Sequence, residues 1–235
     1  MIKTIFIDSA VTLEAKLTTP VNETSKIFII VSGSGHGDMD GNIRQIKPNM
    51  YKLLSDELND LGYATLRYNK RGIGESEGNF HTTGLSDFLV DLDACVKHAK
   101  EILKYKEVYL LGHSEGSIIN TLYSKDHDID GMILLSGAGV SLMTAVLEQN
   151  YSIIEEIKTA KGFKGKLLRL LVKEKSLIKK QKKLFAKFIN SDKDMMRVQF
   201  MRMPAKWFRE HFIYTDEDML NILKDTEIPT LAITG

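Results

Sequence analysis

The sequence predicts an α/β fold in which a mostly parallel sheet is covered by helices on both faces. Short, continuously apolar runs alternate with segments of helical periodicity, which is the pattern of β-α-β units. Several of the apolar runs end in glycine-rich loops. Because the carboxyl ends of parallel strands lie along one edge of a sheet, we expect a ligand site built from these loops at that edge.

The expected elements follow one another in a regular order. The chain begins with two short antiparallel strands, at Ile2–Asp8 and Val11–Leu17. Buried strands are predicted at Lys26–Val31, Ala64–Tyr68, Val108–Leu111, Gly131–Ser136 and Ile228–Gly235, and helices at Pro48–Leu61, Ser86 or Asp87 to Leu103, Ile118–Tyr123 and residues 216–223.

Composition favours a cytoplasmic protein without a nucleic-acid or membrane partner. The net charge of +1 gives no reason to expect an acidic partner. The single cysteine, Cys95, excludes an internal disulfide and falls on the apolar face of a predicted helix. No signal peptide is recognisable, and no run approaches the ~20 apolar residues of a membrane span. No cluster of histidine and cysteine has metal-ligand spacing, so no cofactor is expected.

One pentapeptide lies between a predicted strand and a predicted helix. Gly112-His113-Ser114-Glu115-Gly116 has the spacing G-x-S-x-G. Where a strand turns directly into a helix, the central residue is forced into a strained backbone conformation and its side chain projects above the sheet edge. Glycine is needed on both sides because a Cβ there would meet the neighbouring strand or helix. Ser114 is therefore the predicted nucleophile, and an ordinary loop between strand and helix is the alternative.

A glycine-rich loop follows the predicted strand Lys26–Val31. Three glycines within Gly33–Gly37 allow a sharp turn whose backbone N–H groups point outward and can hold an oxyanion. We expect the N–H of Ser34, or that of Gly35, to form an oxyanion hole with the N–H of Glu115. A structural turn is the alternative. Nucleotide binding is poorly supported, because the spacing is not G-x-G-x-x-G.

The pattern changes after residue 139. Between residues 140 and 213 no strand-like run appears, and apolar residues recur at helical spacing. We interpret 1–139 as the core, 140–213 as a helical cap inserted above the loop edge, and 214–235 as the return to the core. From Lys158 to Lys187 the chain carries eleven lysines and one arginine against one glutamate. We interpret this segment as a solvated basic face, with a lid that attracts anionic substrates or membrane surfaces as the alternative.

Together these motifs resemble the α/β-hydrolase superfamily, especially bacterial serine esterases with a helical cap. The resemblance rests on Gly33–Gly35 followed by Asp38–Asn42, on Leu66–Ser76, on Gly112–Gly116, on Trp207–Phe208 and on the closing Ile228–Gly235. It implies that Ser114 attacks the carbonyl of a small-molecule carboxylic ester and forms an acyl-enzyme, from which water releases the acid.

The loop Asn69–Ser76 departs from the family pattern at its first residue. Asn69 stands where many relatives carry an aspartate, which affects a structural contact rather than the chemistry. Arg71 in the same loop is expected to bind neighbouring carbonyl groups and to hold the loop in place.

The catalytic acid and histidine of the family follow the nucleophile, beyond a strand such as Thr230–Thr234. The sequence ends at Gly235, and none of its six histidines occupies the family position, with His36 the nearest substitute. We therefore expect a chain truncated before the acid and the histidine, without the last strand or strands and helix of the fold. Such a chain is expected to be inactive or severely impaired, because a serine hydroxyl without a base is a poor nucleophile. Its exposed last strand is expected to permit a homodimer.

Three alternatives to an esterase stay open from the sequence. A thioesterase and an aminopeptidase-like hydrolase use the same nucleophile and the same chemistry. A non-catalytic binding protein that has lost its triad is a third possibility. The acyl and alcohol groups of a substrate do not follow from these motifs, since they depend on the packing of the cap.

Overall fold

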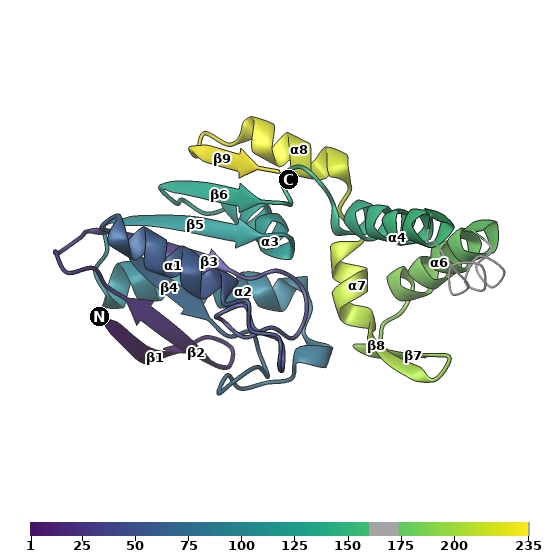
Figure 1. Cartoon of the computed structure of the whole chain (residues 1–235), viewed down its shortest axis with the longest axis horizontal. Helices are drawn as coiled ribbons and strands as arrows, with labels where there is room; N and C mark the ends of the chain where they lie inside the picture. Colours follow the sequence, from purple (N-terminus) through teal and green to yellow (C-terminus); the bar gives the residue numbers. More distant parts are fainter. Residues whose placement is uncertain (160–173, 235) are drawn as a thin grey trace.

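The computed structural model describes residues 1–159 and 174–234, which form a sheet, its covering helices and a helical region beside it (Figure 1). The strands are β1 (Ile2–Asp8), β2 (Thr12–Thr18), β3 (Lys26–Val31), β4 (Ala64–Tyr68), β5 (Glu107–His113), β6 (Gly131–Leu135), β7 (Met195–Val198), β8 (Met201–Pro204) and β9 (Thr230–Ile233). The helices are α1 (Met50–Asp60), the 3-10 helix η1 (Phe80–Thr82), α2 (Leu85–Lys97), the π-helix η2 (His98–Ile102), α3 (Glu115–Ser124), α4 (Leu142–Thr159), α6 (Glu174–Ile189), α7 (Ala205–His211) and α8 (Asp216–Asp225).

The main sheet has the strand order β1-β2-β4-β3-β5-β6-β9. The pairs β4-β3, β3-β5, β5-β6 and β6-β9 are parallel, whereas β1-β2 and β2-β4 are antiparallel. The central strand β3 is buried along nearly its whole length, as its continuous apolar run requires. The predicted α/β fold with a mostly parallel sheet is confirmed. A strand forms at all five predicted positions, but the last of them, β9, is exposed rather than buried.

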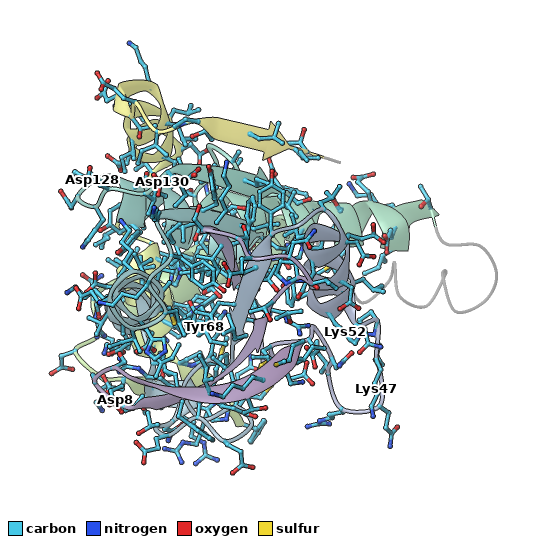
Figure 2. All side chains as sticks on the ribbon, turned by 90° about the vertical axis from the view of Figure 1, so that its left-hand side faces the viewer. Asp8, Lys47, Lys52, Tyr68, Asp128 and Asp130 are labelled. Atoms are coloured by element: carbon cyan, nitrogen blue, oxygen red, sulfur yellow. The ribbon has the colours of Figure 1, made fainter. Side chains whose placement is uncertain are left out.

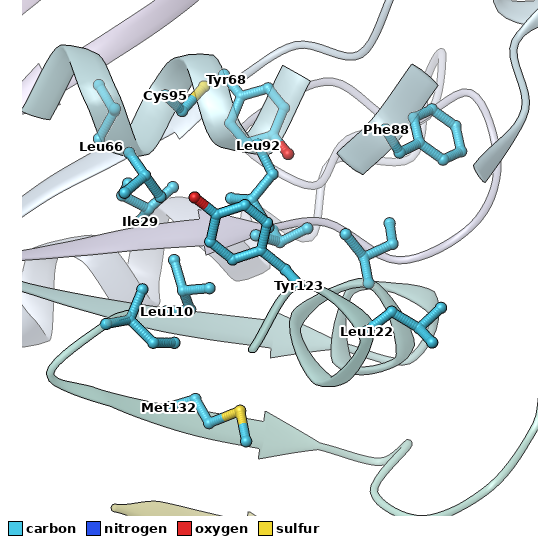
Figure 3. Close-up of a cluster of buried hydrophobic side chains, with 14 of the residues drawn as sticks. Ile29, Leu66, Tyr68, Phe88, Leu92, Cys95, Leu110, Leu122, Tyr123 and Met132 are labelled. Atoms are coloured by element: carbon cyan, nitrogen blue, oxygen red, sulfur yellow. The ribbon is translucent and has the colours of Figure 1, made fainter. Parts of the chain in front are cut away.

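Hydrophobic clusters of unequal size lie on the two faces of the sheet. On one face, α2, α3 and α8 contribute to a large core that includes Ile29, Leu92, Leu110 and Tyr123 (Figure 3). On the other face, α1 contributes Tyr51 to a small cluster with side chains of β3 and β5. In Figure 2 Tyr68 lies inside the molecule, and Lys47 and Lys52 lie at its edge. The free Cys95 is fully buried in the large core, and burial raises its pKa well above the ordinary value.

Helix α2 begins earlier than the sequence predicts. We expected Ser86 or Asp87 to cap it, but the residue before its first turn is Gly84. Asp87 instead lies inside the first turn, and its carboxylate accepts the backbone N–H of Gly84 at 2.8 Å. An acidic side chain at this position also interacts favourably with the positive end of the helix.

The region between β6 and α8 contains a hairpin that the sequence analysis missed. Helices α4 and α6 were expected as helical segments, but β7 and β8 pair antiparallel, with Met195 opposite Pro204. Gln199, in the turn between them, has φ 55°. The expectation of no strand between residues 140 and 213 is therefore wrong. Two strands of four residues are too short to give a clear alternation of apolar and polar positions.

Helix α6 carries part of the predicted basic segment. Its Phe185 and Phe188 are buried, whereas its lysines from 179 to 187 are exposed, as expected for a solvated basic face. The part of the predicted basic segment at residues 160–173 lies outside the described residues. None of the helices in the described ranges combines the length and the apolar character that crossing a membrane requires.

Strand β9 forms one edge of the sheet. It pairs with β6 in parallel register, with Leu231 opposite Ile133. All four of its residues are exposed, so neither of its faces is covered. Within residues 1–159 and 174–234, no strand pairs with its other edge.

Candidate active site

Ser114 stands at the corner between β5 and α3. Its backbone has φ 53° and ψ −115°, a conformation that is rare for residues with a side chain and costs on the order of 1–3 kcal/mol. The Ser114 N–H donates to the carbonyl of Leu135 at 2.8 Å, and its own carbonyl accepts the N–H of Ser117 at 2.9 Å. The strained corner is thus held by the neighbouring strand and by the first turn of the helix.

The two glycines of the pentapeptide lie where a side chain has no room. A Cβ on Gly112 would lie 2.4 Å from the carbonyl oxygen of Gly116, and a Cβ on Gly116 would lie 2.1 Å from that of Val31. Both contacts are with backbone, which has little freedom to move away. The spacing G-x-S-x-G is therefore a direct consequence of how closely β3, β5 and α3 approach one another.

The loop after β3 is fixed to the same corner through a tyrosine. The N–H of Gly33 donates to Tyr51 Oη at 2.7 Å, and this hydroxyl lies 3.0 Å from His113 Nδ1. Because a backbone amide can only donate, the tyrosine hydroxyl accepts from Gly33 and donates its hydrogen to His113. Burial lowers the pKa of His113, which keeps its Nδ1 available as an acceptor at neutral pH. His113 therefore supports the loop rather than the Ser114 hydroxyl.

Ser34 and Ser114 line the same cleft. The loop passes close to Ser114, since a Cβ on Gly33 would lie 3.4 Å from Ser114 Cβ. Within the described residues the N–H of Ser34 makes no hydrogen bond. The N–H of Glu115 is in the first turn of α3, where helix N–H groups have no intrahelical acceptor. Gly35 has φ 102° and is not among the residues that line the cleft, so Ser34 is the better placed of the two loop candidates.

The cleft has a volume of about 670 Å³ and lies between the sheet and the helical region. Its walls come from the loop after β6, from α4 and from Trp207 on α7. The apolar side chains that line it are Ile118, Ala138, Val140, Leu142, Ala145, Val146, Ile153 and Trp207. Glu148 is the one charged residue among the described residues of this lining. The cleft can therefore hold an apolar acyl group beside the Ser114 hydroxyl.

All six histidines lie in the described ranges, and none forms a hydrogen bond with Ser114. His36, the nearest substitute by sequence, contacts the rings of Phe80 and His81 and does not line the cleft. Its pKa is lowered by burial and by His81. The described residues also contain no group of three histidine, cysteine or acidic side chains suited to hold a metal ion.

Residues 47–235 match the family described as serine aminopeptidase, S33. The match covers most of the chain and includes Gly112–Gly116, the corner called the elbow below, but it begins after the Gly33–Gly37 loop. The chain belongs to the serine aminopeptidase S33 family. The resemblance to α/β-hydrolases is thereby confirmed from the sequence side, as the parallel sheet confirms it from the structural side.

Known relatives of this S33-family chain are esterases and other α/β-hydrolases. Esterase EstD from Thermotoga maritima is 27% identical over 225 residues, which are 95% of this chain and 49% of EstD. The chain thus spans about half the length of this curated relative. Est1E from Butyrivibrio proteoclasticus, solved with bound ferulic acid, has a TM-score of 0.61 at 21% identity, over 97% of this chain and 77% of Est1E. The α/β-hydrolase GrgF from Penicillium sp. sh18 has a TM-score of 0.60 at 13% identity, over 100% of this chain and 80% of GrgF, and both structures support the fold alone.

Beneath the elbow, this S33-family chain buries a carboxylate with three partners. Glu115 is inaccessible to solvent, and Lys70 Nζ donates to its Oε2 at 2.6 Å. From α7, Trp207 Nε1 donates to Oε1 at 2.5 Å, and His211 Nε2 lies 3.2 Å from the same oxygen. Burial opposes ionisation of Glu115, but Lys70 and His211 outweigh it and lower its pKa to about 2. Glu115, the residue after Ser114, therefore joins the elbow to α7.

The contact made by Nδ1 of His211 indicates which nitrogen of its ring carries a proton. His211 Nδ1 lies 2.8 Å from the carbonyl oxygen of Trp207. A carbonyl only accepts, so Nδ1 carries a proton. A hydrogen bond from Nε2 to Glu115 then requires a second proton, and without it Nε2 is a buried atom that lacks a partner.

Arg71 holds its loop in place, but chiefly through carboxylates rather than carbonyls. Its Nε and Nη2 donate to Asp91 at 2.8 and 2.9 Å, and its Nη1 donates to Asp87 at 2.9 Å. A carbonyl contributes only one longer contact, from Nη2 to Asp87 O at 3.4 Å. The expectation of binding to neighbouring carbonyls is corrected accordingly: the loop is tied to α2 by a buried ion pair.

Asn69 has a partner that explains why it is not an aspartate. Its Oδ1 accepts the N–H of Met39 at 2.6 Å, and its Nδ2 donates to Glu14 Oε2 at 2.6 Å. An aspartate keeps the first bond but lacks the donor for the second, and it sets two carboxylates against each other. The departure from the family pattern thus concerns structure, as the sequence suggests.

Four residues around the site were not predicted to act there: Tyr51, Lys70, Trp207 and His211. The sequence alone assigns a role in the site to none of them. Lys70 lies inside a recognised motif, between Asn69 and Arg71, and that position was the available signal. The contacts of Trp207 and His211 with Glu115 join residues about ninety positions apart, which no local pattern reveals.

Proposed function

We propose that this protein is a serine esterase that cleaves carboxylic esters of small molecules through an acyl-enzyme on Ser114. One observation carries the proposal: the strained Ser114 lines the same apolar cleft as Ser34, whose N–H has no partner among the described residues. The name of EstD, an esterase that aligns with 95% of the chain, supports the same reaction class.

In the proposed reaction the Ser114 oxygen attacks the ester carbonyl while its apolar acyl group occupies the cleft. The carbonyl oxygen becomes negatively charged, and the N–H groups of Ser34 and Glu115 donate to it. Each donor of this kind lowers the barrier by roughly 2.7–4 kcal/mol. The alcohol leaves with a proton, and water then attacks the acyl-enzyme and releases the acid.

The proposed reaction needs a base that removes the proton from the Ser114 hydroxyl. None of the six histidines contacts Ser114. We therefore propose that these 235 residues by themselves hydrolyse esters slowly or not at all, and that the acid and the histidine come from sequence beyond them. Esterase activity is thus a proposal for the whole protein.

The test measures hydrolysis of p-nitrophenyl butyrate by the 235-residue chain and by the product of the complete reading frame. We expect turnover by the second and little by the first, and loss of turnover in Ser114→Ala. If Ser114→Ala still hydrolyses the ester, Ser114 is not the nucleophile. If the 235-residue chain hydrolyses the ester and Ser114→Ala abolishes that hydrolysis, the proposal that these residues lack a base is wrong. No turnover by either form favours a non-catalytic binding protein.

An aminopeptidase is the second candidate, favoured by the family description and by one residue of the cleft. Glu148 is the one charged residue among the described residues that line the cleft, and it can bind the free amino group of a peptide substrate. Hydrolysis of an aminoacyl p-nitroanilide separates the two candidates. If Glu148→Gln abolishes that hydrolysis and spares the butyrate ester, the aminopeptidase is favoured.

A further inference from the structure

Lys70 is a buried cation whose ammonium group has three contacts. Its side chain is 3% exposed. Nζ donates to the carbonyl oxygen of Gly33 at 2.7 Å and to Glu115 Oε2 at 2.6 Å, and it lies 4.7 Å from the centre of the Phe88 ring. An ammonium has three hydrogens, so two oxygens and one aromatic face use all of them. The position of Nζ is thus fixed from three sides.

The first of these contacts controls a neighbouring N–H. The carbonyl of Gly33 and the N–H of Ser34 belong to one peptide unit, which is planar and points its oxygen and its hydrogen in opposite directions. Because Lys70 holds the oxygen in the buried interior, the hydrogen of Ser34 is directed away from the interior. On that side Ser34 and Ser114 line the cleft.

The peptide unit would be easy to rotate without this contact. Gly33 has no side chain to restrict its backbone, and a Cβ there would lie 3.0 Å from His113 Nδ1, so the residue cannot be made stiffer by substitution. Tyr51 binds the N–H of Gly33 and fixes the preceding peptide unit, but it leaves the following one free. Only Lys70 among the described residues binds the Gly33 carbonyl.

The second contact reaches the other proposed oxyanion donor. Glu115 follows Ser114 in the chain, and its side chain accepts from Lys70 while its own N–H starts α3. One ammonium group therefore holds the peptide of the first donor and the side chain of the second. Its positive charge also withdraws electron density from the Gly33 carbonyl, which makes the N–H of the same peptide a stronger donor.

We propose that Lys70 is a positioning residue that fixes the two halves of the oxyanion hole relative to each other, through the Gly33 carbonyl and the Glu115 carboxylate. This inference rests on the proposed function, since it takes Ser34 and Glu115 as the oxyanion donors. It assigns Lys70 no contact with the substrate. Its effect is on the transition state, because the oxyanion is fully formed only there.

The first experiment compares Lys70→Met with the parent enzyme in the form that hydrolyses p-nitrophenyl butyrate. Methionine has a similar length but cannot hold the Gly33 carbonyl. We expect kcat to fall by about 10²-fold, the lower end of the effect of losing one oxyanion donor, while KM changes little. An unchanged kcat in a folded variant overturns the proposal.

A double variant separates positioning from charge balance. Lys70→Met alone leaves Glu115 short of a buried cation and can fail to fold, whereas Lys70→Met with Glu115→Gln removes both charges. If Lys70 positions the loop, the double variant regains stability while its kcat stays as low as that of Lys70→Met. If Lys70 only balances the charge, kcat recovers to the value of Glu115→Gln alone, and the proposal is wrong.

A third measurement does not depend on catalytic activity, so it tests the positioning role of Lys70 separately from the proposed esterase function. In the 235-residue chain, the ¹⁵N amide signal of Ser34 is expected to shift in Lys70→Met and in the double variant. Arg71→Met is the matched control, because it removes the neighbouring buried cation, which has no contact with Gly33. A Ser34 signal that stays unchanged in Lys70→Met overturns the positioning role. Shifted Ser34 signals without any esterase activity in either form retain the positioning role and reject the proposed function.

Discussion

Lys70 and Arg71 are consecutive residues, yet their buried charges serve two different parts of the molecule. Lys70 points to the elbow and, through Glu115, to α7. Arg71 points to α2 and binds Asp87 and Asp91. In the first cluster one carboxylate contacts three side chains, whereas in the second one cation is shared by two carboxylates.

The difference lies in what remains when the central group is removed. Without Glu115, the ammonium of Lys70 keeps only the Gly33 carbonyl and the Phe88 ring. Without Arg71, Asp87 keeps Lys206 at 2.6 Å and Asp91 keeps the hydroxyl of Ser9 at 2.7 Å. The cluster at the site therefore depends on one residue, and the cluster at α2 does not.

The largest expected effect is the loss of stability in Glu115→Leu. Removing one partner of a buried ion pair costs about 3–5 kcal/mol, because the other charge is left without compensation. Arg71→Leu is expected to cost clearly less, since both of its carboxylates keep other donors. Urea unfolding of the two variants gives the comparison. Equal losses of unfolding free energy would show that the two clusters do not differ in this way.

A second expected effect is loss of the Glu115 contribution in acid. The pKa of Glu115 is lowered from 4.5 to about 2, so its charged form stabilises the fold at every pH above 4.5. As pH falls toward 2 the carboxylate becomes protonated and this contribution, about 3 kcal/mol, disappears. The difference in unfolding free energy between the parent and Glu115→Gln should therefore be constant above pH 5 and shrink below it. A difference that does not vary with pH contradicts the role of the charge.

The smallest loss of stability is expected in Asn69→Asp, at the residue before Lys70. The new carboxylate faces Glu14, and we expect a loss of about 1–2 kcal/mol. The double variant Asn69→Asp with Glu14→Gln restores a donor next to the new carboxylate and should recover most of this stability. Thermal unfolding of the three proteins measures the effect. A single variant as stable as the parent would mean that the Asn69–Glu14 bond contributes nothing.

Most strands of the sheet could be predicted from the sequence, because the pattern that indicates a strand lies within the strand itself. The predicted bounds of β3 and β4 agree with the structure, and β3 is a continuous apolar run after Lys26. The hairpin of β7 and β8 was not predicted, because each strand has only four residues, all at most half-buried, and therefore shows no clear apolar pattern. The start of α2 was misplaced because Asp87 stabilises the helix from within its first turn rather than from the position before it.

For the candidate site, the sequence located the strained corner at Ser114 but not its surroundings. The spacing of Gly112, Ser114 and Gly116 reflects a steric requirement within five consecutive residues, so it can be recognised in the sequence alone. The cluster around Glu115 joins residues 45 and 92 positions apart. Each of its members is common in proteins, and only the fold brings them together.

Trp207 is the single tryptophan of the chain, and it forms part of the cleft wall while its indole N–H binds Glu115. All tryptophan emission from these 235 residues therefore originates in the wall of the cleft that Ser114 also lines. The entry of an apolar molecule displaces water from one side of this fluorophore, and a movement of α7 breaks its bond on the other side. The chain thus carries its own optical reporter, with which occupancy of the cleft can be titrated before any ester is cleaved.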